Sequence, residues 1–201
     1  FALELGAALS GMDWVSAYAG GINTGTFHKV LSANLYTNKQ PIWVTMEGNR
    51  LTNEPVANST DQSNAWNAAT DNLVYIIFND AMLEDPSTIL YGVADLKAAW
   101  EEQLALGKNI WAADTIEELA QKAGIDAAGL TATGEAYNKA CAGEAEGSFG
   151  RTGKMIAPEK GGMIYALKTM PYVMMTNGGV AVNGNANIIR RDGTPIRGLD
   201  L

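Results

Sequence analysis

Residues 172–183 read YVMMTNGGVAVN, two runs of strand-forming residues joined by the pair Gly178-Gly179. Glycine has no Cβ, so the backbone at this pair can pass close to a ligand or adopt a positive φ. A Gly-Gly pair is also typical of a bulge or tight turn between strands. The segment alone therefore predicts two strands that meet at a bend, and the surrounding sequence must decide whether the bend presents a ligand.

Other strand patterns occur along the chain. Residues 41–46 alternate and return after a turn at residues 47–49, which predicts a hairpin. The apolar run 73–78 has the length of a buried strand rather than of a helix. Met170-Pro171 lies between two further strand patterns. We expect strands at residues 12–18, 41–46, 50–53, 73–78, 163–168, 172–176, 180–183 and 188–191.

Helix patterns occupy the start and the middle of the chain. Ser59 and Gln62 have the spacing of a capping box, and Gly107 and Gly124 stand where helices commonly end. We expect helices at residues 1–9, 59–70, 93–106, 114–124 and 126–142. Strands and helices that mix without a regular strand-helix-strand repeat predict the α+β fold class.

Composition excludes several kinds of function. The net charge of −8 over 201 residues argues against nucleic acid as a partner, because phosphate binding needs clustered Lys and Arg. No apolar run reaches the roughly 20 residues needed to cross a bilayer, so we expect no direct membrane insertion. Cys141 is the only cysteine and His28 the only histidine, so we expect no internal disulfide and no metal site.

A set of short motifs runs in order through the chain. They are GNRLTNE at 48–54, ADTIEELA at 113–120, GID at 124–126, YN at 137–138, FGR at 149–151, TNGGV at 176–180 and GTPIRGL at 193–199. This ordered set resembles the flavoprotein subunits of fumarate reductases and succinate dehydrogenases. The soluble bacterial branch, which includes flavocytochrome fumarate reductases, urocanate reductases and ketosteroid dehydrogenases, is the most similar.

The resemblance implies an FAD-dependent oxidoreductase that acts on a C=C or CH–CH bond. It implies the substrate-capping α+β domain at residues 18–175, a fragment of the FAD-binding domain at 1–17 and a return segment to that domain at 176–201. In this family the cap is an insertion, so the two end segments are expected to lie close together. A non-catalytic binding or assembly domain of the same descent is the alternative. Accidental matches in an unrelated domain are disfavoured by the order of the motifs.

The resemblance also implies site residues. Tyr18 stands at a position that holds a substrate carboxylate, Asn58 at the position of the proton-donating arginine, and Met174 at that of a substrate-binding histidine. Thr176 is expected to contact both substrate and flavin. The expected flavin-contacting residues are Met175, Thr176, Asn177, Gly178 and Gly179.

These positions change the expected substrate. The amide of Asn58 carries no charge and cannot replace a guanidinium as proton donor, and the thioether of Met174 is soft and apolar. Fumarate and succinate are therefore poor candidates, and a larger, less charged small molecule is expected. Arg50 and Glu54, four residues apart, are expected to form a structural ion pair.

The main FAD-binding motif of the family has no counterpart in these residues. The start of the chain reads as a helix entered midway, and its end stops where the family pattern continues, so we expect an excised piece of a longer protein. An electron-donor protein or a haem domain is the further partner that the resemblance implies. The location is expected to be either the cytoplasm or the bacterial cell envelope.

Overall fold

The computed structural model describes residues 1–25, 31–35, 41–56, 58–83, 85–151 and 155–200. His28 therefore lies outside the described residues. The chain divides into two compact units, unit 1 formed by Phe1–Ala17 with Val173–Leu201, and unit 2 formed by Tyr18–Tyr172. The strands β2 (Val15–Ile22) and β8 (Ile164–Thr176) contain the points at which the chain passes from one unit to the other.

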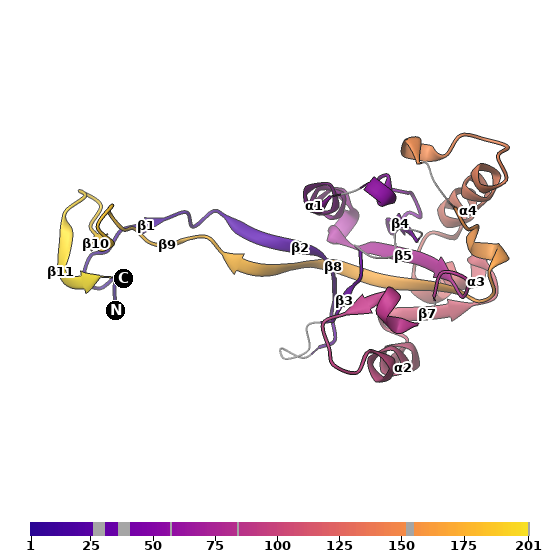
Figure 1. Cartoon of the computed structure of the whole chain (residues 1–201), viewed down its shortest axis with the longest axis horizontal. Coiled ribbons are helices and arrows are strands. Elements are labelled where there is room, and N and C mark those ends of the chain that lie inside the picture. Colours follow the sequence, from indigo (N-terminus) through magenta and orange to yellow (C-terminus); the bar gives the residue numbers. More distant parts are fainter. Residues whose placement is uncertain (26–30, 36–40, 57, 84, 152–154, 201) are drawn as a thin grey trace. The chain divides into compact units, whose positions relative to one another are not determined.

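The main sheet has strands in the order β4-β5-β8-β2-β3-β6, with β7 also paired to β8 (Figure 1). Its other strands are β3 (Leu31–Ala33), β4 (Ile42–Val44), β5 (Val74–Asn79), β6 (Leu90–Tyr91) and β7 (Ile110–Ala113). The pairs β4–β5, β5–β8, β7–β8, β2–β3 and β3–β6 are antiparallel. Mixed helices and antiparallel strands confirm the α+β class.

Within the described ranges, the α-helices that cover this sheet are α1 (Ser59–Ala68), α2 (Leu96–Leu106), α3 (Ile116–Ala123) and α4 (Ala127–Cys141). All six residues of β5 are buried because both faces of the strand are covered. Ile76 and Phe78 pack in one core with Trp66 of α1 and Trp100 of α2. Tyr75 and Ile77 pack in a second core with residues of α3 and α4. This explains why the strand reads as a continuous apolar run rather than an alternating one.

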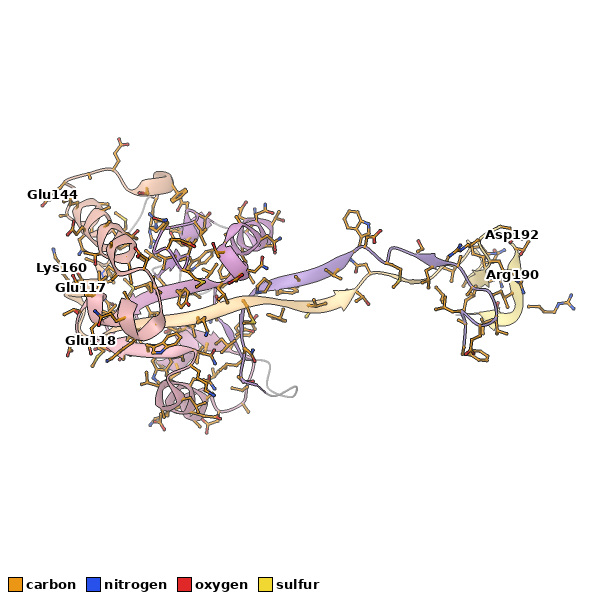
Figure 2. The ribbon with its side chains drawn as sticks, turned by 180° about the vertical axis from the view of Figure 1, so that it is seen from behind. Glu117, Glu118, Glu144, Lys160, Arg190 and Asp192 are labelled. Atoms are coloured by element: carbon orange, nitrogen blue, oxygen red, sulfur yellow. The ribbon has the colours of Figure 1, made fainter. Side chains whose placement is uncertain are left out.

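The surface of unit 2 carries its charge on the outer side of these helices and loops. Glu117, Glu118, Glu144 and Lys160 point outward in Figure 2. Glu118 pairs with Lys122 one helical turn later, at 2.7 Å, and both side chains remain about half exposed. Such exposed pairs contribute little to the stability of unit 2, whose interior contains the two apolar cores.

Unit 1 consists of short strands that tie the two ends of the chain together. Strand β1 (Leu9–Ser10) pairs with β9 (Gly179–Val180), and β10 (Asn187–Ile189) pairs with β11 (Pro195–Asp200). Its core is small and centres on Ala7, Ile188 and Ile196. Arg190 and Asp192 lie at the turn between β10 and β11 (Figure 2).

Three expectations about the backbone were wrong. Residues 50–53 form no strand, because only Arg50 returns to pair with Val44, as an isolated bridge. Residues 2–6 form turns rather than a helix, because Gly6 adopts φ +85° and redirects the chain so that Ala7 can pair with Arg190. Residues 164–176 form one continuous strand through Pro171 rather than two. The pairing with β5 ends at Thr169, so the missing N–H of Pro171 breaks no bond to that strand.

Candidate functional site

The flavin-contacting residues expected from the sequence, together with Met174, lie in unit 1. Met174 and Met175 are each 55% exposed, and Thr176 and Asn177 are exposed as well. The backbone N–H of Asn177 donates to Trp14 O at 3.0 Å. The segment therefore forms an exposed edge with two apolar and two polar side chains. Its backbone is hydrogen-bonded to the N-terminal part of the same unit.

The two glycines of this segment differ in their surroundings. A Cβ on Gly178 would lie 2.6 Å from both Gly11 O and Met12 Cα, so glycine is required there by the crossing of the protein's own backbone. Within the described residues, a Cβ on Gly179 would meet no atom within 4 Å. Open space for a ligand is therefore found beside Gly179 and not beside Gly178.

The other two expected site residues lie in unit 2. The exposed ring of Tyr18 stacks on that of Tyr172, with ring centroids 6.0 Å apart. The hydroxyl groups of Tyr172 and Tyr91 are 3.2 Å apart. The structure thus places Tyr18 in a group of three tyrosines on β2, β8 and β6, a grouping that the sequence analysis did not foresee.

Asn58 forms the N-cap of α1. Its side-chain Oδ1 accepts from the N–H of Thr60 at 2.8 Å and of Asp61 at 3.0 Å, and the Asp61 carboxylate accepts from the N–H of Asn58. The predicted capping box at Ser59 and Gln62 was wrong by one residue, because Asn58 is the last residue with extended backbone before the helix. The amide oxygen is therefore occupied by helix capping.

A buried charge cluster ties two distant segments of unit 2 together. Glu54 is 0% exposed, and its carboxylate accepts from Arg50 Nε at 3.1 Å, Arg50 Nη2 at 2.5 Å and Arg151 Nη1 at 2.9 Å. It also accepts from the backbone N–H of Trp43 at 3.1 Å. The expected Arg50–Glu54 pair is confirmed. The part played by Arg151 was missed, although the FGR motif at 149–151 was its signal.

Tyr137 of α4 packs between the two guanidinium groups of this cluster. Its ring centroid is 5.8 Å from Arg50 Cζ and 5.1 Å from Arg151 Cζ. Burial raises the pKa of the Tyr137 hydroxyl to about 12, and the positive charge of Arg151 opposes that shift. The tyrosine is therefore neutral near neutral pH and forms an aromatic wall for two cations.

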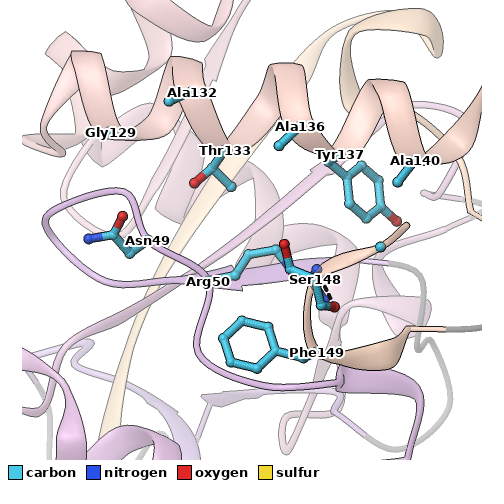
Figure 3. A pocket seen from close by; sticks show the side chains of 11 residues that line it. Asn49, Arg50, Gly129, Ala132, Thr133, Ala136, Tyr137, Ala140, Ser148 and Phe149 are labelled. Atoms are coloured by element: carbon cyan, nitrogen blue, oxygen red, sulfur yellow. Dashed lines mark hydrogen bonds between the residues drawn. The ribbon is translucent and has the colours of Figure 1, made fainter. Parts of the chain in front are cut away.

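A cavity of about 280 Å³ opens between α4 and the cluster (Figure 3). One wall is a stripe of residues on α4, and the opposite side is the 3-10 turn η4 (Ser148–Gly150), which Arg50 Nη1 holds by donating to Ser148 O at 3.1 Å. The lining residues are Asn49, Arg50, Gly129, Ala132, Thr133, Ala136, Tyr137, Ala140, Gly147, Ser148 and Phe149. The cavity is thus lined by one charged side chain, Arg50, and by the aromatic rings of Tyr137 and Phe149.

Among the described residues, no group of three or more His, Cys, Asp and Glu side chains is arranged to hold a metal ion. The helices in the same described ranges are too short or too polar to cross a membrane. The edge at residues 174–179 combines two exposed thioethers, an exposed threonine and free space at Gly179 among the described residues.

Known proteins resemble the chain over almost its whole length. The FAD binding domain model matches residues 30–199. Urocanate reductase of Eggerthella lenta is 31% identical over 98% of this chain and 31% of its own length. NADH:fumarate oxidoreductase of Klebsiella pneumoniae is 34% identical over 78% of this chain and 16% of its own length.

A solved structure agrees with these sequence relatives. The open conformation of a flavocytochrome c3 fumarate reductase superposes with a TM-score of 0.68 at 26% identity, over 99% of this chain and 32% of that one. The chain spans less than a third of the length of each of these three proteins. On the family match, the relatives and the fold together, this chain belongs to the FAD-binding flavoproteins of the fumarate reductase type.

Proposed function

We propose that this chain is part of an FAD-dependent oxidoreductase that reduces a C=C bond or oxidises a CH–CH bond. The observation that carries the proposal is the likeness over 98% of the chain to a urocanate reductase, with the motifs in the same order. Bound FAD supplies the hydride transfer in such a reaction. The residues of this chain would orient the substrate, exclude water and handle the proton.

We propose that residues 18–175 form the substrate-capping domain and that residues 1–17 and 176–201 belong to the FAD-binding domain. The division of the chain supports this, since Phe1–Ala17 forms one unit with Val173–Leu201 and Tyr18–Tyr172 forms the other. Unit 1 also exposes large apolar side chains, with Trp14 at 71% and Val173 at 61%. Apolar exposure of this kind is typical of a surface that packs against further protein.

Within unit 1, we assign the flavin edge to Met175, Thr176, Asn177 and Gly179. Thr176 supplies a hydroxyl, and the free space beside Gly179 lets a flat ring approach the backbone. Gly178 has a different role in this proposal, because the backbone of Gly11 and Met12 occupies the space beside it. It shapes the bend and does not itself approach the cofactor.

The substrate of this enzyme is less charged than fumarate. The side-chain oxygen of Asn58 accepts the hydrogen bonds that cap α1, and Met174 has a thioether at the position where a histidine is expected. Hydride transfer to a dicarboxylate needs positive groups that absorb developing charge, and losing one such donor typically costs a factor on the order of a hundred to a thousand. Tyr18 and Met174 instead suit a substrate with a large apolar or aromatic body.

The test uses the protein encoded by the complete gene, with a reduced artificial electron donor. We expect bound FAD in the purified protein, turnover of aryl-substituted alkenes such as urocanate or 4-vinylphenol, and no useful turnover of fumarate. Fumarate turnover comparable to that of a dedicated fumarate reductase would overturn the substrate assignment. A purified protein without FAD would overturn the proposed cofactor.

The alternative is a non-catalytic binding or assembly domain of the same descent. Two positions favour this alternative. Asn58, whose amide oxygen caps α1, stands where the family has a proton-donating arginine, and the thioether of Met174 stands where the family has a substrate-binding histidine. FAD-loaded protein whose reduced flavin is reoxidised by none of these aryl-substituted alkenes would support this alternative. For the proposed oxidoreductase, we propose an electron-donor protein or a haem domain as the partner.

A further inference from the structure

Another cavity, with a volume of about 700 Å³, lies beside the C-terminal end of α2. Its walls come from the segment after β2, the end of α2, the loop into β7, and the strands β7 and β8, whose course can be followed in Figure 1. All the lining residues belong to unit 2, and the volume lies within the range of about 300–1,000 Å³ that is typical of small-molecule sites. They are Asn23, Thr24, Gly25, Gln103, Leu106, Gly107, Lys108, Asn109, Trp111, Lys168 and Met170.

The charged side chains that line this cavity are cations. Among the described lining residues, Lys108 and Lys168 carry charge, and no Asp or Glu is present. The ion pairs within the described ranges involve neither of these lysines. This local excess of positive charge occurs in a chain whose net charge is −8. Because a cleft lined by one sign of charge concentrates ligands of the opposite sign, the cavity favours an anion.

Lys168 is positioned by an aromatic ring. Its Nζ lies 5.5 Å from the centroid of the Trp111 ring, in a cation–π contact. An ammonium group has three hydrogens to donate, and in the part of the chain that the structure describes none of those on Lys168 is hydrogen-bonded. The side chain is thus directed across Trp111 and keeps its donors available for a ligand.

Hydrogen bonds of Asn109 fix the walls around Lys168. Asn109 is 5% exposed, and its Nδ2 donates to Asn23 O at 3.0 Å and to Gln103 Oε1 at 2.7 Å. Its backbone carbonyl accepts from the N–H of Lys168 at 2.8 Å. Asn109 therefore joins the segment after β2, helix α2 and strand β8, so the cavity is formed before any ligand binds, as is usual for small-molecule sites.

The remaining walls define the rest of the ligand. Leu106, Trp111 and Met170 line the cavity with apolar surface; Leu106 is 50% exposed, and the other two side chains are partly exposed. A ligand with an apolar body would cover this surface, whereas an inorganic anion would leave it in water. Two ammonium groups match the two charges of a phosphate monoester better than the single charge of a carboxylate. Lysine also suits phosphate because it acts as a compact point charge.

We propose that this cavity binds a small organic phosphate monoester with an apolar or aromatic body. Its phosphate accepts from the ammonium groups of Lys108 and Lys168, and its body contacts Leu106, Trp111 and Met170. The occupant bridges the loop after α2 and strand β8 and compensates the positive charge of the two lysines. The proposal does not depend on the proposed redox function, because binding can be measured whatever reaction the protein catalyses.

The test is isothermal titration calorimetry of the protein encoded by the complete gene with phenyl phosphate, at about pH 8, where a phosphate monoester carries nearly two negative charges. Lys108→Gln and Lys168→Gln should each weaken binding by about fivefold or more, the effect of one unit charge in contact with the ligand in water. Phenyl sulfate, which has the same shape and one charge, should be weaker by a similar factor. Lys97→Gln removes an exposed lysine of α2 outside the cavity and should leave the affinity unchanged.

The lysine variants assign the measured binding to this cavity rather than to another site of the complete protein. Circular dichroism verifies that each variant is folded, and Lys108, whose side chain is exposed, tests the site even if Lys168→Gln does not fold. Absence of phenyl phosphate binding would overturn the proposal. Full affinity in both Lys108→Gln and Lys168→Gln, or equal binding of phenyl sulfate, would do the same. Inorganic phosphate that binds as tightly as phenyl phosphate would contradict the assigned apolar body.

Discussion

Glu54→Gln is the perturbation that most directly tests how unit 2 is held together. Glutamine keeps the size of the side chain but removes the charge, and it replaces one of the two acceptor oxygens by an amide donor. The four hydrogen bonds that Glu54 accepts, from Trp43, Arg50 and Arg151, would lose their common anion. Two buried guanidinium groups would then repel each other with no carboxylate between them.

The cost follows from burial. Breaking a buried ion pair by removing one partner costs about 3–5 kcal/mol, against a total stability of about 5–15 kcal/mol for a typical domain. For a domain of this size the loss corresponds to a fall in Tm of about 6–20 °C. Loosening of the Ser148–Arg151 turn should accompany it, because Arg151 is held to the hairpin through Glu54.

Urea unfolding followed by tryptophan fluorescence measures this loss in unit 2, because four of the five tryptophans lie there. Glu118→Gln is the matched control. It makes the same chemical change in an exposed pair with Lys122 and should leave the urea midpoint nearly unchanged. A Glu54→Gln variant that unfolds within about 1 kcal/mol of the unmodified chain would show that the cluster does not stabilise the fold as argued.

Three further predictions concern single positions. Asn58→Ala removes the cap of α1 and should lower stability by about 1 kcal/mol in urea unfolding, whereas Asn58→Asp keeps an acceptor oxygen and should be close to the original. Equal stability of the two variants would contradict the capping role. Gly178→Ala should destabilise unit 1 and speed its amide hydrogen exchange, because a Cβ on residue 178 would lie 2.6 Å from backbone atoms. Gly179→Ala should leave the exchange rates unchanged, so similar rates in the two variants would refute this. The pKa of Tyr137 is about 12 in the folded chain and 10.0 when exposed, so the unfolded state loses its proton first and stability should fall between pH 10 and 12; Tyr137→Phe should make this fall shallower.

Local signals in the sequence predicted the helices well. Gly107 and Gly124 end α2 and α3 in left-handed conformations as expected, and the helix expected from residue 126 begins with Asp126 as its N-cap. These features depend only on neighbouring residues, which is why a single sequence reveals them. The apolar run of β5 was also predicted, because burial of both faces leaves a continuous pattern.

Features that depend on distant residues were missed. The approach of Arg151 to Glu54 joins positions 97 residues apart, and the FGR motif at 149–151 marks Arg151 without indicating its partner. Residues 1–6 have helical periodicity, yet Gly6 turns the chain toward Arg190 at its other end. The continuity of β8 past Pro171 depended on where the pairing with β5 stops. In each case tertiary structure overrode a reasonable local expectation.

The stacking of Tyr18 on Tyr172 has a consequence for protein engineering. These are the first and last residues of unit 2, and their rings lie 6.0 Å apart. A domain whose two ends adjoin can be transplanted into another host, or rejoined as a circular permutant, with only a short linker. Under the division of the chain proposed above, chimaeras that exchange residues 18–172 between relatives would exchange the proposed substrate-capping part and keep the proposed flavin-binding part. Gene recombination at the same two junctions would exchange the same unit in natural lineages.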